Sequence, residues 1–355
     1  MAFYVPGLLA RLPRDQKIYW PRFNPFENYN DKQFLKRFRF DRNGVIEICD
    51  MVRDNMEPDT SFGGAIPLEI RVCAALRYYA TVGSLQLGVG DMFGISQSSV
   101  CRFVWDFSYS FVRHLNNVIT FPEGVLVDQQ RENFFNVTQI PNVLGAIDCT
   151  HVLIQKPSEF PHSFVNRKGW PSINVQAVCD FEGRFINIYA KWPGATHDSF
   201  ILRQSELFQR FEMGHINGRL LGDSGYPLKP WLMVPFAVPT NGPQENFNEG
   251  LRRGRVKIEQ AFGICKKRFL CLRSELKVHP SKACLMIVCA AMLNNLATQR
   301  NLPILYAPED VDAAAAAEEV YPQQPYFHPD AALADVGLGA LSGLAMRQHI
   351  VEQFF

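Results

Sequence analysis

Apolar residues recur at helical spacing through most of residues 1–140. The pattern predicts one helix that begins at Asp31, which can cap its first turn, and two further helices over residues 45–56 and 68–80. Pro122 is expected to end this helical block, because a proline inside a helix removes a hydrogen bond and clashes with the preceding turn. We therefore predict a helical N-terminal region.

Residues 85–115 have the sequence form of a helix-turn-helix. A short first helix ends at Gly94. Ser96 or Ser98 can cap a second helix, which has Arg102 in its first turns. In this motif the second helix enters the major groove of DNA with its N-terminal residues towards the bases. An ordinary helical hairpin has the same pattern, so DNA contact and simple packing both remain open interpretations.

After Pro141 the apolar pattern changes from helical spacing to alternation. Four short segments have the pattern of β-strands: residues 143–148, 174–179, 184–190 and 218–223. The second and third are joined by residues 180–183, a hairpin signal in which Asp180 is a turn residue. The first and fourth are apolar runs that end in an acid, Asp148 and Asp223 respectively. Buried strands of this kind would carry a carboxylate at their ends.

A basic helix follows, and it carries a carboxylate beside its buried face. Between residues 251 and 282 the chain has ten Lys or Arg but only two acids, one of which is Glu259. Apolar residues at helical spacing give the helix a buried face, and Glu259 lies at its edge. An ion pair of Glu259 with Arg255 or Lys266 explains the same spacing without any chemistry. Residues 227–249, rich in Pro and Asn, are expected to form an insertion before this helix.

The order of these elements is that of the ribonuclease H-like fold. A helix over residues 200–211 separates the third strand from the fourth, and the basic helix comes last. We predict an α/β domain over residues 141–300, with a ribonuclease H-like mixed sheet flanked by helices. In that fold the first and fourth strands lie side by side, and the later helix would place Glu259 over Asp148 and Asp223.

Three converging acids are what two-metal phosphoryl-transfer chemistry requires. Each Mg²⁺ is held by one or two carboxylates and by oxygens of the substrate phosphate. Asp198, just past the third strand, is a fourth candidate ligand, although an aspartate at a helix start also serves as an N-cap. His151 and His197 are candidates for supporting contacts with a phosphate, or for ordinary hydrogen bonds.

The net charge of +1 gives no overall attraction to nucleic acid, but the charge is segregated. The basic helix contrasts with the tail, residues 301–355, in which eight acids after Pro303 stand against Arg347 alone. We expect this tail to be partly mobile and to end in one helix over residues 345–355. Candidates for contacts with a nucleic-acid backbone follow from charge and include the aromatic residue of a basic loop: Arg167, Lys168, Trp170, Arg255, Lys266 and Lys267.

The nine cysteines form no CxxC pair, and several lie inside apolar runs. Such thiols pack as small apolar groups and are typical of the reducing nucleus or cytosol. No run approaches the roughly 20 apolar residues of a membrane span, and the first residues lack the pattern of a signal peptide. We therefore expect no membrane contact.

Five ordered motifs resemble the PIF/Harbinger transposases and the host nucleases derived from them. They are Ile147-Asp-Cys-Thr-His151, Val165-Asn-Arg-Lys-Gly169, Trp192-Pro-Gly194 with His197-Asp-Ser199, Leu221-Gly-Asp-Ser-Gly-Tyr226, and Ile258-Glu-x-x-Phe262-Gly. The 35 residues between Asp223 and Glu259 are also a spacing common among acid-triad transposases. The resemblance covers residues 24–300. Cys149 departs from it, because many members carry Gly after the first acid.

The resemblance implies a metal-dependent DNA endonuclease, with strand transfer in active transposons. It implies that Asp148, Asp223 and Glu259 are the catalytic acids and that Asp198 joins them in binding Mg²⁺ or Mn²⁺. It also implies a Myb-like partner protein that assists DNA binding and nuclear import. Together with the reducing compartment that the cysteines indicate, this predicts a location in the nucleus and also in the cytoplasm. A homo-oligomer is left open. Two alternatives are a non-cutting DNA-binding or scaffold protein that retains the fold, and a nuclease that acts on RNA.

Overall fold

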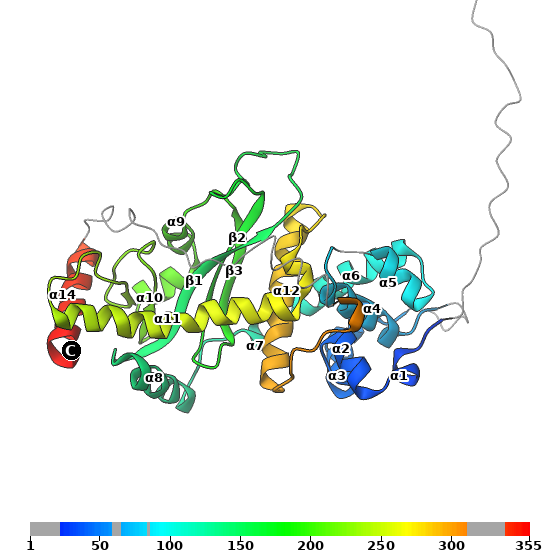
Figure 1. Ribbon diagram of the computed structural model, residues 1–355, viewed down its shortest axis with the longest axis horizontal. Coiled ribbons are helices and arrows are strands. Elements are labelled where there is room, and N and C mark those ends of the chain that lie inside the picture. The colour runs from blue at the N-terminus through cyan, green and yellow to red at the C-terminus, as the bar shows by residue number, and fades with distance from the viewer. Residues whose placement is uncertain (1–21, 59–64, 84–85, 311–337) are drawn as a thin grey trace, which may run out of the picture.

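The computed structural model describes residues 22–58, 65–83, 86–310 and 338–355. A five-stranded mixed sheet lies between the N-terminal helices at one end of the long axis and the C-terminal helix at the other (Figure 1). The strands are β1 (Val143–Leu153), β2 (Ser172–Cys179), β3 (Phe185–Pro193), β4 (Arg219–Leu221) and β5 (Leu232–Met233). Their order across the sheet is β3-β2-β1-β4-β5. The domain is thus a mixed α/β fold with helices on both faces of the sheet.

β1 has a different type of partner on each side. It pairs antiparallel with β2 and parallel with β4. The predicted adjacency of the first and fourth strands is therefore confirmed. The sequence pattern does not predict β5, which pairs parallel with β4, because two residues are too short a run to recognise.

β1 is longer than its apolar run. The prediction that this strand ends at Asp148 is wrong, since antiparallel pairing with β2 continues to the pair of Leu153 with Ser172. Polar residues at 148–151 interrupt the apolar pattern, but the backbone stays in the sheet because β2 supplies its hydrogen-bond partners.

The helices before the sheet are α1 (Pro25–Asn28), α2 (Asp31–Phe38), α3 (Arg42–Met56), α4 (Leu68–Ala80), α5 (Gln86–Phe93), α6 (Gln97–Val112), α7 (Leu115–Val118) and α8 (Val125–Thr138). The cap of α2 is Asn30 and not Asp31. The Asn30 side chain accepts a hydrogen bond from the Gln33 backbone N–H in a capping box. The Ser96 side chain caps α6, and DNA contact by α6 stays a prediction.

Helix α8 corrects the prediction that the helical block ends at Pro122. It lies against β1 and packs through buried residues such as Phe134. The pattern does not reveal it, because Val125 and Leu126 are largely exposed and blur its apolar face.

The remaining helices are α9 (Asp198–Arg203), α10 (Glu206–Glu212), α11 (Gly242–Arg268), the short 3₁₀ helix η1 (Leu270–Arg273), α12 (Pro280–Gln299) and α14 (Leu338–Phe354). The single helix predicted over 200–211 is two helices, because Ser205 starts a new one by accepting a hydrogen bond from the Phe208 N–H. The insertion predicted over 227–249 ends at Asn241, which caps α11. Asn and Pro mark loops and helix starts alike, so composition misplaced this boundary.

One buried cluster joins the N-terminal helices to the face of the sheet that α11 and α12 cover. A second cluster lies on the other face and includes residues of α9 and α10. α12 is long and apolar enough to cross a membrane by length and composition alone. Most of it is buried in the protein, however, and it packs on β3 and α6 as a core helix.

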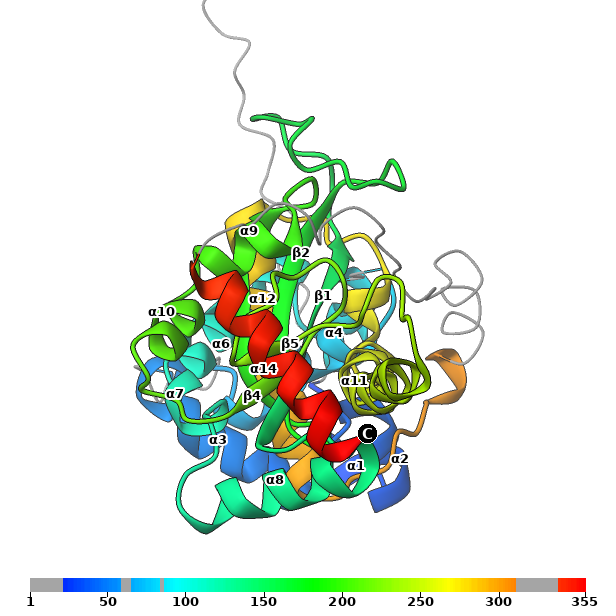
Figure 2. The same ribbon diagram turned by 90° about the vertical axis from the view of Figure 1, so that its left-hand side faces the viewer.

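The segment after α12 folds back onto the N-terminal helices. Asp310 is buried there and accepts hydrogen bonds from Arg77 and Arg39. At the opposite end, α14 lies across the side of the sheet that carries β5 and contacts α11 (Figure 2). It begins before the residue 345 that the sequence predicts. Residues 311–337, on which most of the predicted mobility falls, lie outside the described residues.

Candidate active site

Asp148 and Asp223 are brought together by the pairing of β1 with β4. The last residue pair of that parallel ladder is Ala146 with Leu221, and each aspartate lies two residues beyond it. Because the strands run in the same direction, residues at equal distances past the last pair emerge at one edge of the sheet. Asp148 and Asp223 are only 7% and 4% exposed.

Helix α11 packs closely on β4 and on the end of α8 because two of its residues lack a side chain. A methyl group on Gly254 would overlap Leu221 of β4, and one on Gly250 would overlap the carbonyl oxygen of Thr138. The contact between Gly254 and Leu221 sets the distance between α11 and the strands. Glu259 follows Gly254 by about 1.4 helical turns and lies within ion-pair distance of Arg255.

The Arg255 guanidinium lies between the acids. Its Nη2 is 2.9 Å from Asp148 Oδ2 and 3.5 Å from Glu259 Oε1, so the two carboxylate oxygens are no farther apart than the sum of these distances. Burial lowers the pKa of the guanidinium, but the negative charges of these two acids and of Asp223 raise it by more. The structure therefore brings Asp148, Asp223 and Glu259 around one cationic side chain.

The pKa of Asp148 is strongly perturbed. Burial raises the pKa of its carboxyl to about 7, Arg255 opposes the rise, and the charge of Asp223 adds to it. Its Oδ1 accepts a hydrogen bond of 2.8 Å from the Cys149 backbone N–H. A carboxyl with a pKa of about 7 is only partly ionised at neutral pH, and a nearby cation favours its charged form.

Carboxylate oxygens are the ligands that Mg²⁺ and Mn²⁺ prefer, so the acids fit a divalent cation in chemistry. In the arrangement observed, Asp148 Oδ2 is held by Arg255, and Asp223 Oδ1 accepts from the Gly225 N–H. Among the described residues, no group of three or more His, Cys, Asp or Glu side chains has the arrangement of a metal site. The positive charge between the acids belongs to Arg255.

Asp198 is positioned separately from the other acids. It is the first residue of α9, and its Oδ1 accepts a hydrogen bond of 3.0 Å from Asn174 of β2. The alternative role as an N-cap is wrong, because His197 occupies the cap position and makes no capping hydrogen bond with its side chain. The charge of Asp198 still contributes to the raised pKa of Asp148, so the two carboxylates sense each other.

A cavity of about 170 Å³ separates Asp198 from the loop between β1 and β2. Both predicted histidines, His151 and His197, contribute to its lining. Burial lowers the pKa of His151 to about 4, so the ring is neutral at pH 7, and its Nδ1 lies 3.1 Å from Ser172 Oγ. His151 can therefore donate or accept a hydrogen bond here but carries no positive charge.

The residues that the sequence predicts to contact DNA fall into two groups, one held inside the fold and one exposed. Lys266 is tied down inside the fold, where its Nζ donates to Thr150 Oγ1 at 2.8 Å and to the His151 carbonyl oxygen at 2.9 Å. Burial lowers the pKa of Lys266 to about 8. In contrast, Lys168 and the half-exposed Trp170 lie on the β1–β2 loop.

Two asparagines that the sequence pattern does not single out shape this region. The buried Asn166 folds the β1–β2 loop, because its Oδ1 accepts hydrogen bonds from the Lys168 and Trp170 backbone N–H groups. Asn174 holds Asp198. Asn174 is buried in β2. A polar residue within a predicted strand is the one signal of Asn174 that the sequence contains.

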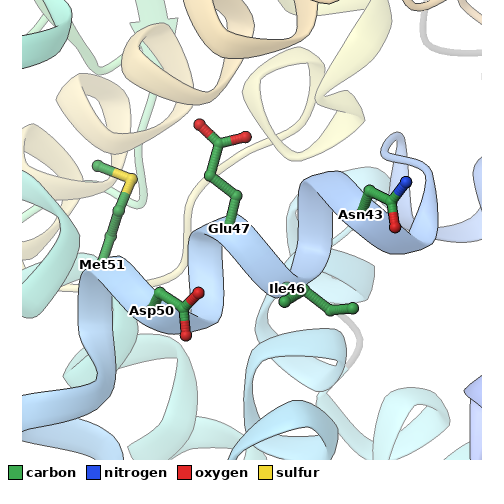
Figure 3. A pocket seen from close by; sticks show the side chains of 5 residues that line it. All are labelled: Asn43, Ile46, Glu47, Asp50 and Met51. Atoms are coloured by element: carbon green, nitrogen blue, oxygen red, sulfur yellow. The ribbon is translucent and has the colours of Figure 1, made fainter.

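A second hollow lies on α3, in the N-terminal helices (Figure 3). Its lining includes the exposed Ile46 and the carboxylates of Glu47 and Asp50. Glu47 pairs with Arg300 at 2.6 Å and Asp50 with Arg53 at 2.8 Å. These acids are already neutralised within the protein, so we assign no chemistry to this hollow.

Residues 147–295 match the model of a family described as "DDE superfamily endonuclease". The match begins one residue before Asp148 and includes Asp198, Asp223 and Glu259. The human protein named "Putative nuclease HARBI1" is 31% identical over 300 residues, which cover 83% of this chain and 86% of that protein. The chain belongs to the Harbinger transposase-derived nuclease family.

Relatives in a frog and a plant extend the comparison. "Putative nuclease HARBI1" of Xenopus laevis is 31% identical over 284 residues, covering 79% of this chain and 82% of the frog protein. "Protein ALP1-like" of Arabidopsis thaliana is 30% identical over 260 residues, covering 67% of this chain and 63% of the plant protein. No solved structure matches the chain. Membership thus rests on sequence, and the geometry of the site comes from the structure of this chain.

Proposed function

We propose that this chain is a metal-dependent endonuclease with a ribonuclease H-like catalytic domain, and that it hydrolyses phosphodiester bonds of DNA. The observation that carries the proposal is the meeting of Asp148, Asp223 and Glu259 around one guanidinium. Three acids from two strands and a helix have no need to gather in a partly buried place for folding alone, since burying like charges is costly. Membership of a family of DDE-type endonucleases supports the same function.

In this proposal Asp148, Asp223 and Glu259 bind Mg²⁺ or Mn²⁺, and Asp198 supplies a further carboxylate from across the sheet. The metal, when bound, lowers the pKa of an attacking water or DNA 3′-hydroxyl and stabilises the leaving oxygen. Asn174 orients Asp198 through its 3.0 Å hydrogen bond. The neutral His151 provides a hydrogen-bonding group beside the DNA without adding charge.

DNA would lie along the face that carries the β1–β2 loop and the basic part of α11. Arg167, Lys168 and Lys267 are the proposed phosphate contacts, and Trp170 offers an aromatic surface against sugar or base. The N-terminal part of α6 would contact DNA in the manner of a recognition helix. A Myb-like partner and a location in the nucleus and cytoplasm complete the proposal, on the resemblance of the sequence alone.

The test is cleavage of DNA by the purified full chain with Mg²⁺ or Mn²⁺, compared with the Glu259→Gln variant. Glu249→Gln is the matched control, because Glu249 is an exposed residue of the same helix that pairs only with Arg252 in the described structure. Loss of an outer residue that only supports a metal ligand already costs about 10–100-fold in metal affinity or activity, and Glu259 is itself a proposed ligand. We therefore expect Glu259→Gln to lose about 100-fold or more and Glu249→Gln to keep its activity.

A second candidate function is a DNA-binding or scaffold protein that no longer cuts. The specific observation in its favour is Arg255, which neutralises two of the acids within the chain itself. The same assay separates the two functions. Equal cleavage by wild type and Glu259→Gln, including none from either, would favour the non-cutting protein, and offering RNA beside DNA identifies an RNA nuclease.

A further inference from the structure

The side chain of Arg255 stands where a cation bound by Asp148 and Glu259 would have to stand. We propose that Arg255 is an internal cation that competes with the divalent metal ion, so that the metal binds these acids only when the guanidinium moves away. The inference rests on the proposed function for the identity of the metal. Its geometry rests on contacts within the chain.

The oxygens of Asp148 carry the first step. Oδ1 accepts a hydrogen bond of 2.8 Å from the Cys149 backbone N–H, which holds this oxygen in place on β1. Oδ2 accepts Arg255 Nη2 at 2.9 Å. A metal ion that bridges Asp148 Oδ2 and Glu259 Oε1 would lie within about 2–2.5 Å of each oxygen, in the space between them that Nη2 occupies. Two cations cannot share that position, so the guanidinium and the metal exclude each other.

Charge balance provides the second step. Asp148, Asp223 and Glu259 all act on Arg255, so the group holds three carboxyls against one guanidinium. A single positive charge leaves this group under-neutralised when its acids are ionised. A divalent ion compensates the negative charge of the three acids better than Arg255 does. The binding energy of the ion is what would displace the arginine side chain.

The way Arg255 is held provides the third step. Nη2 makes both of its contacts with the acids, whereas Nε is buried and has no hydrogen-bond partner among the described residues. The acids therefore hold the guanidinium through Nη2, at the end of a flexible side chain. Arg252 and Arg253, just before Arg255 on α11, are exposed, so the helix presents further guanidinium groups to solvent beside it.

The experiment measures binding of Mn²⁺ to the full chain without DNA, by calorimetry and by the Mn²⁺ dependence of the melting temperature. We expect Arg255→Gln to bind Mn²⁺ at least about tenfold more tightly than wild type. Without metal, the variant should melt below wild type, because three acids then lack their counter-ion. Its melting temperature should rise more than that of wild type when Mn²⁺ is added.

Arg252→Gln is the matched control, since Arg252 is an exposed arginine of the same helix that pairs with Glu249, and its Mn²⁺ affinity should equal that of wild type. Arg255→Lys is the second variant in case Arg255→Gln does not fold. A lysine retains the charge but loses the fork that reaches both acids, so Mn²⁺ should bind it more tightly than wild type and less tightly than Arg255→Gln.

Unchanged or weaker Mn²⁺ binding by both Arg255 variants would overturn the competition, and so would the absence of any Mn²⁺ binding. The outcome can be told apart from failure of the proposed nuclease. Tighter Mn²⁺ binding by Arg255→Gln without DNA cleavage by wild type would refute the nuclease alone. Cleavage by wild type with no gain of Mn²⁺ affinity in the variants would refute only the competition between Arg255 and the metal.

Discussion

Gly254 of α11 lies directly against Leu221 of β4, and a methyl group at this position would overlap the leucine side chain. The contact matters because Glu259 lies further along the same helix and Asp223 lies just past the same strand. The spacing between helix and strand therefore sets the distance between two of the proposed catalytic acids. A glycine makes that close approach possible.

We expect Gly254→Ala to lower the free energy of unfolding by about 1–3 kcal/mol, because the added methyl overpacks the contact with Leu221. Alanine otherwise favours helices over glycine, so a loss of stability identifies the contact as its cause. Cleavage should fall as well, since a small displacement of Glu259 disturbs the acid geometry. Urea unfolding and the DNA cleavage assay measure the two effects.

Gly242→Ala is the control for this prediction, because Gly242 lies in the first turn of α11 and has open space around it. The Gly242→Ala variant should unfold at the same urea concentration as wild type and should cut DNA as fast as wild type does. A Gly254→Ala variant as stable as this control would show that α11 does not press on β4.

We expect Asp310→Asn to destabilise the protein by about 3–5 kcal/mol. Asp310 is buried and accepts hydrogen bonds from Arg77 at 2.7 Å and 3.0 Å and from Arg39 at 3.4 Å. Loss of its charge leaves two buried guanidinium groups without an adequate counter-ion. Glu309→Gln is the comparison, because the Glu309 side chain is about half-exposed and its ion pairs with Arg37 and the buried Arg77 are longer, at 3.2 Å and 3.4 Å. Its effect should stay under about 1 kcal/mol. Thermal and urea unfolding measure the stability of both variants. An equal loss of stability in Asp310→Asn and Glu309→Gln would contradict the prediction.

The β1–β2 loop provides a prediction about salt. If Lys168 contacts a DNA phosphate, Lys168→Gln should reduce the slope of log affinity against log salt concentration by about 0.9. Fluorescence anisotropy with duplex DNA at several salt concentrations measures the slope. Lys32→Gln, a change at an exposed position of α2, should leave it unaltered. Identical slopes for both variants and wild type would place the DNA away from this loop.

Helix α6 provides a prediction about sequence recognition. Arg102 is exposed in the second turn of α6, beyond the Ser96 cap. If α6 enters the major groove, Arg102→Gln should weaken binding to DNA selected from a random pool by about tenfold, because a good arginine–guanine contact contributes about 1–3 kcal/mol. Arg53→Gln on α3 is the control. Selection of the same DNA sequences at the same affinity by the variant would favour the interpretation of α5 and α6 as a plain helical hairpin.

The sequence by itself determined where most of the strands and the principal helices lie along the chain. Alternation predicted the hairpin of β2 and β3, and apolar spacing predicted the helix that carries Glu259, because both depend on neighbouring residues. It also predicted that the first and fourth strands are adjacent. It failed where one residue type serves two purposes: Asn and Pro at the start of α11 have the composition of a loop.

Spacing on one helix predicted the pair of Glu259 with Arg255, but only the tertiary structure decided how acids and cations of distant segments are paired. Asp148 lies inside β1 and not at its end, because β2 continues to pair with the strand. Asp198 is held by Asn174 and not by its own helix. Arg255, expected by charge alone to contact DNA, contacts Asp148 on a strand 107 positions earlier in the chain. Such partners are set by packing between distant segments and by side-chain direction, which local sequence patterns do not contain.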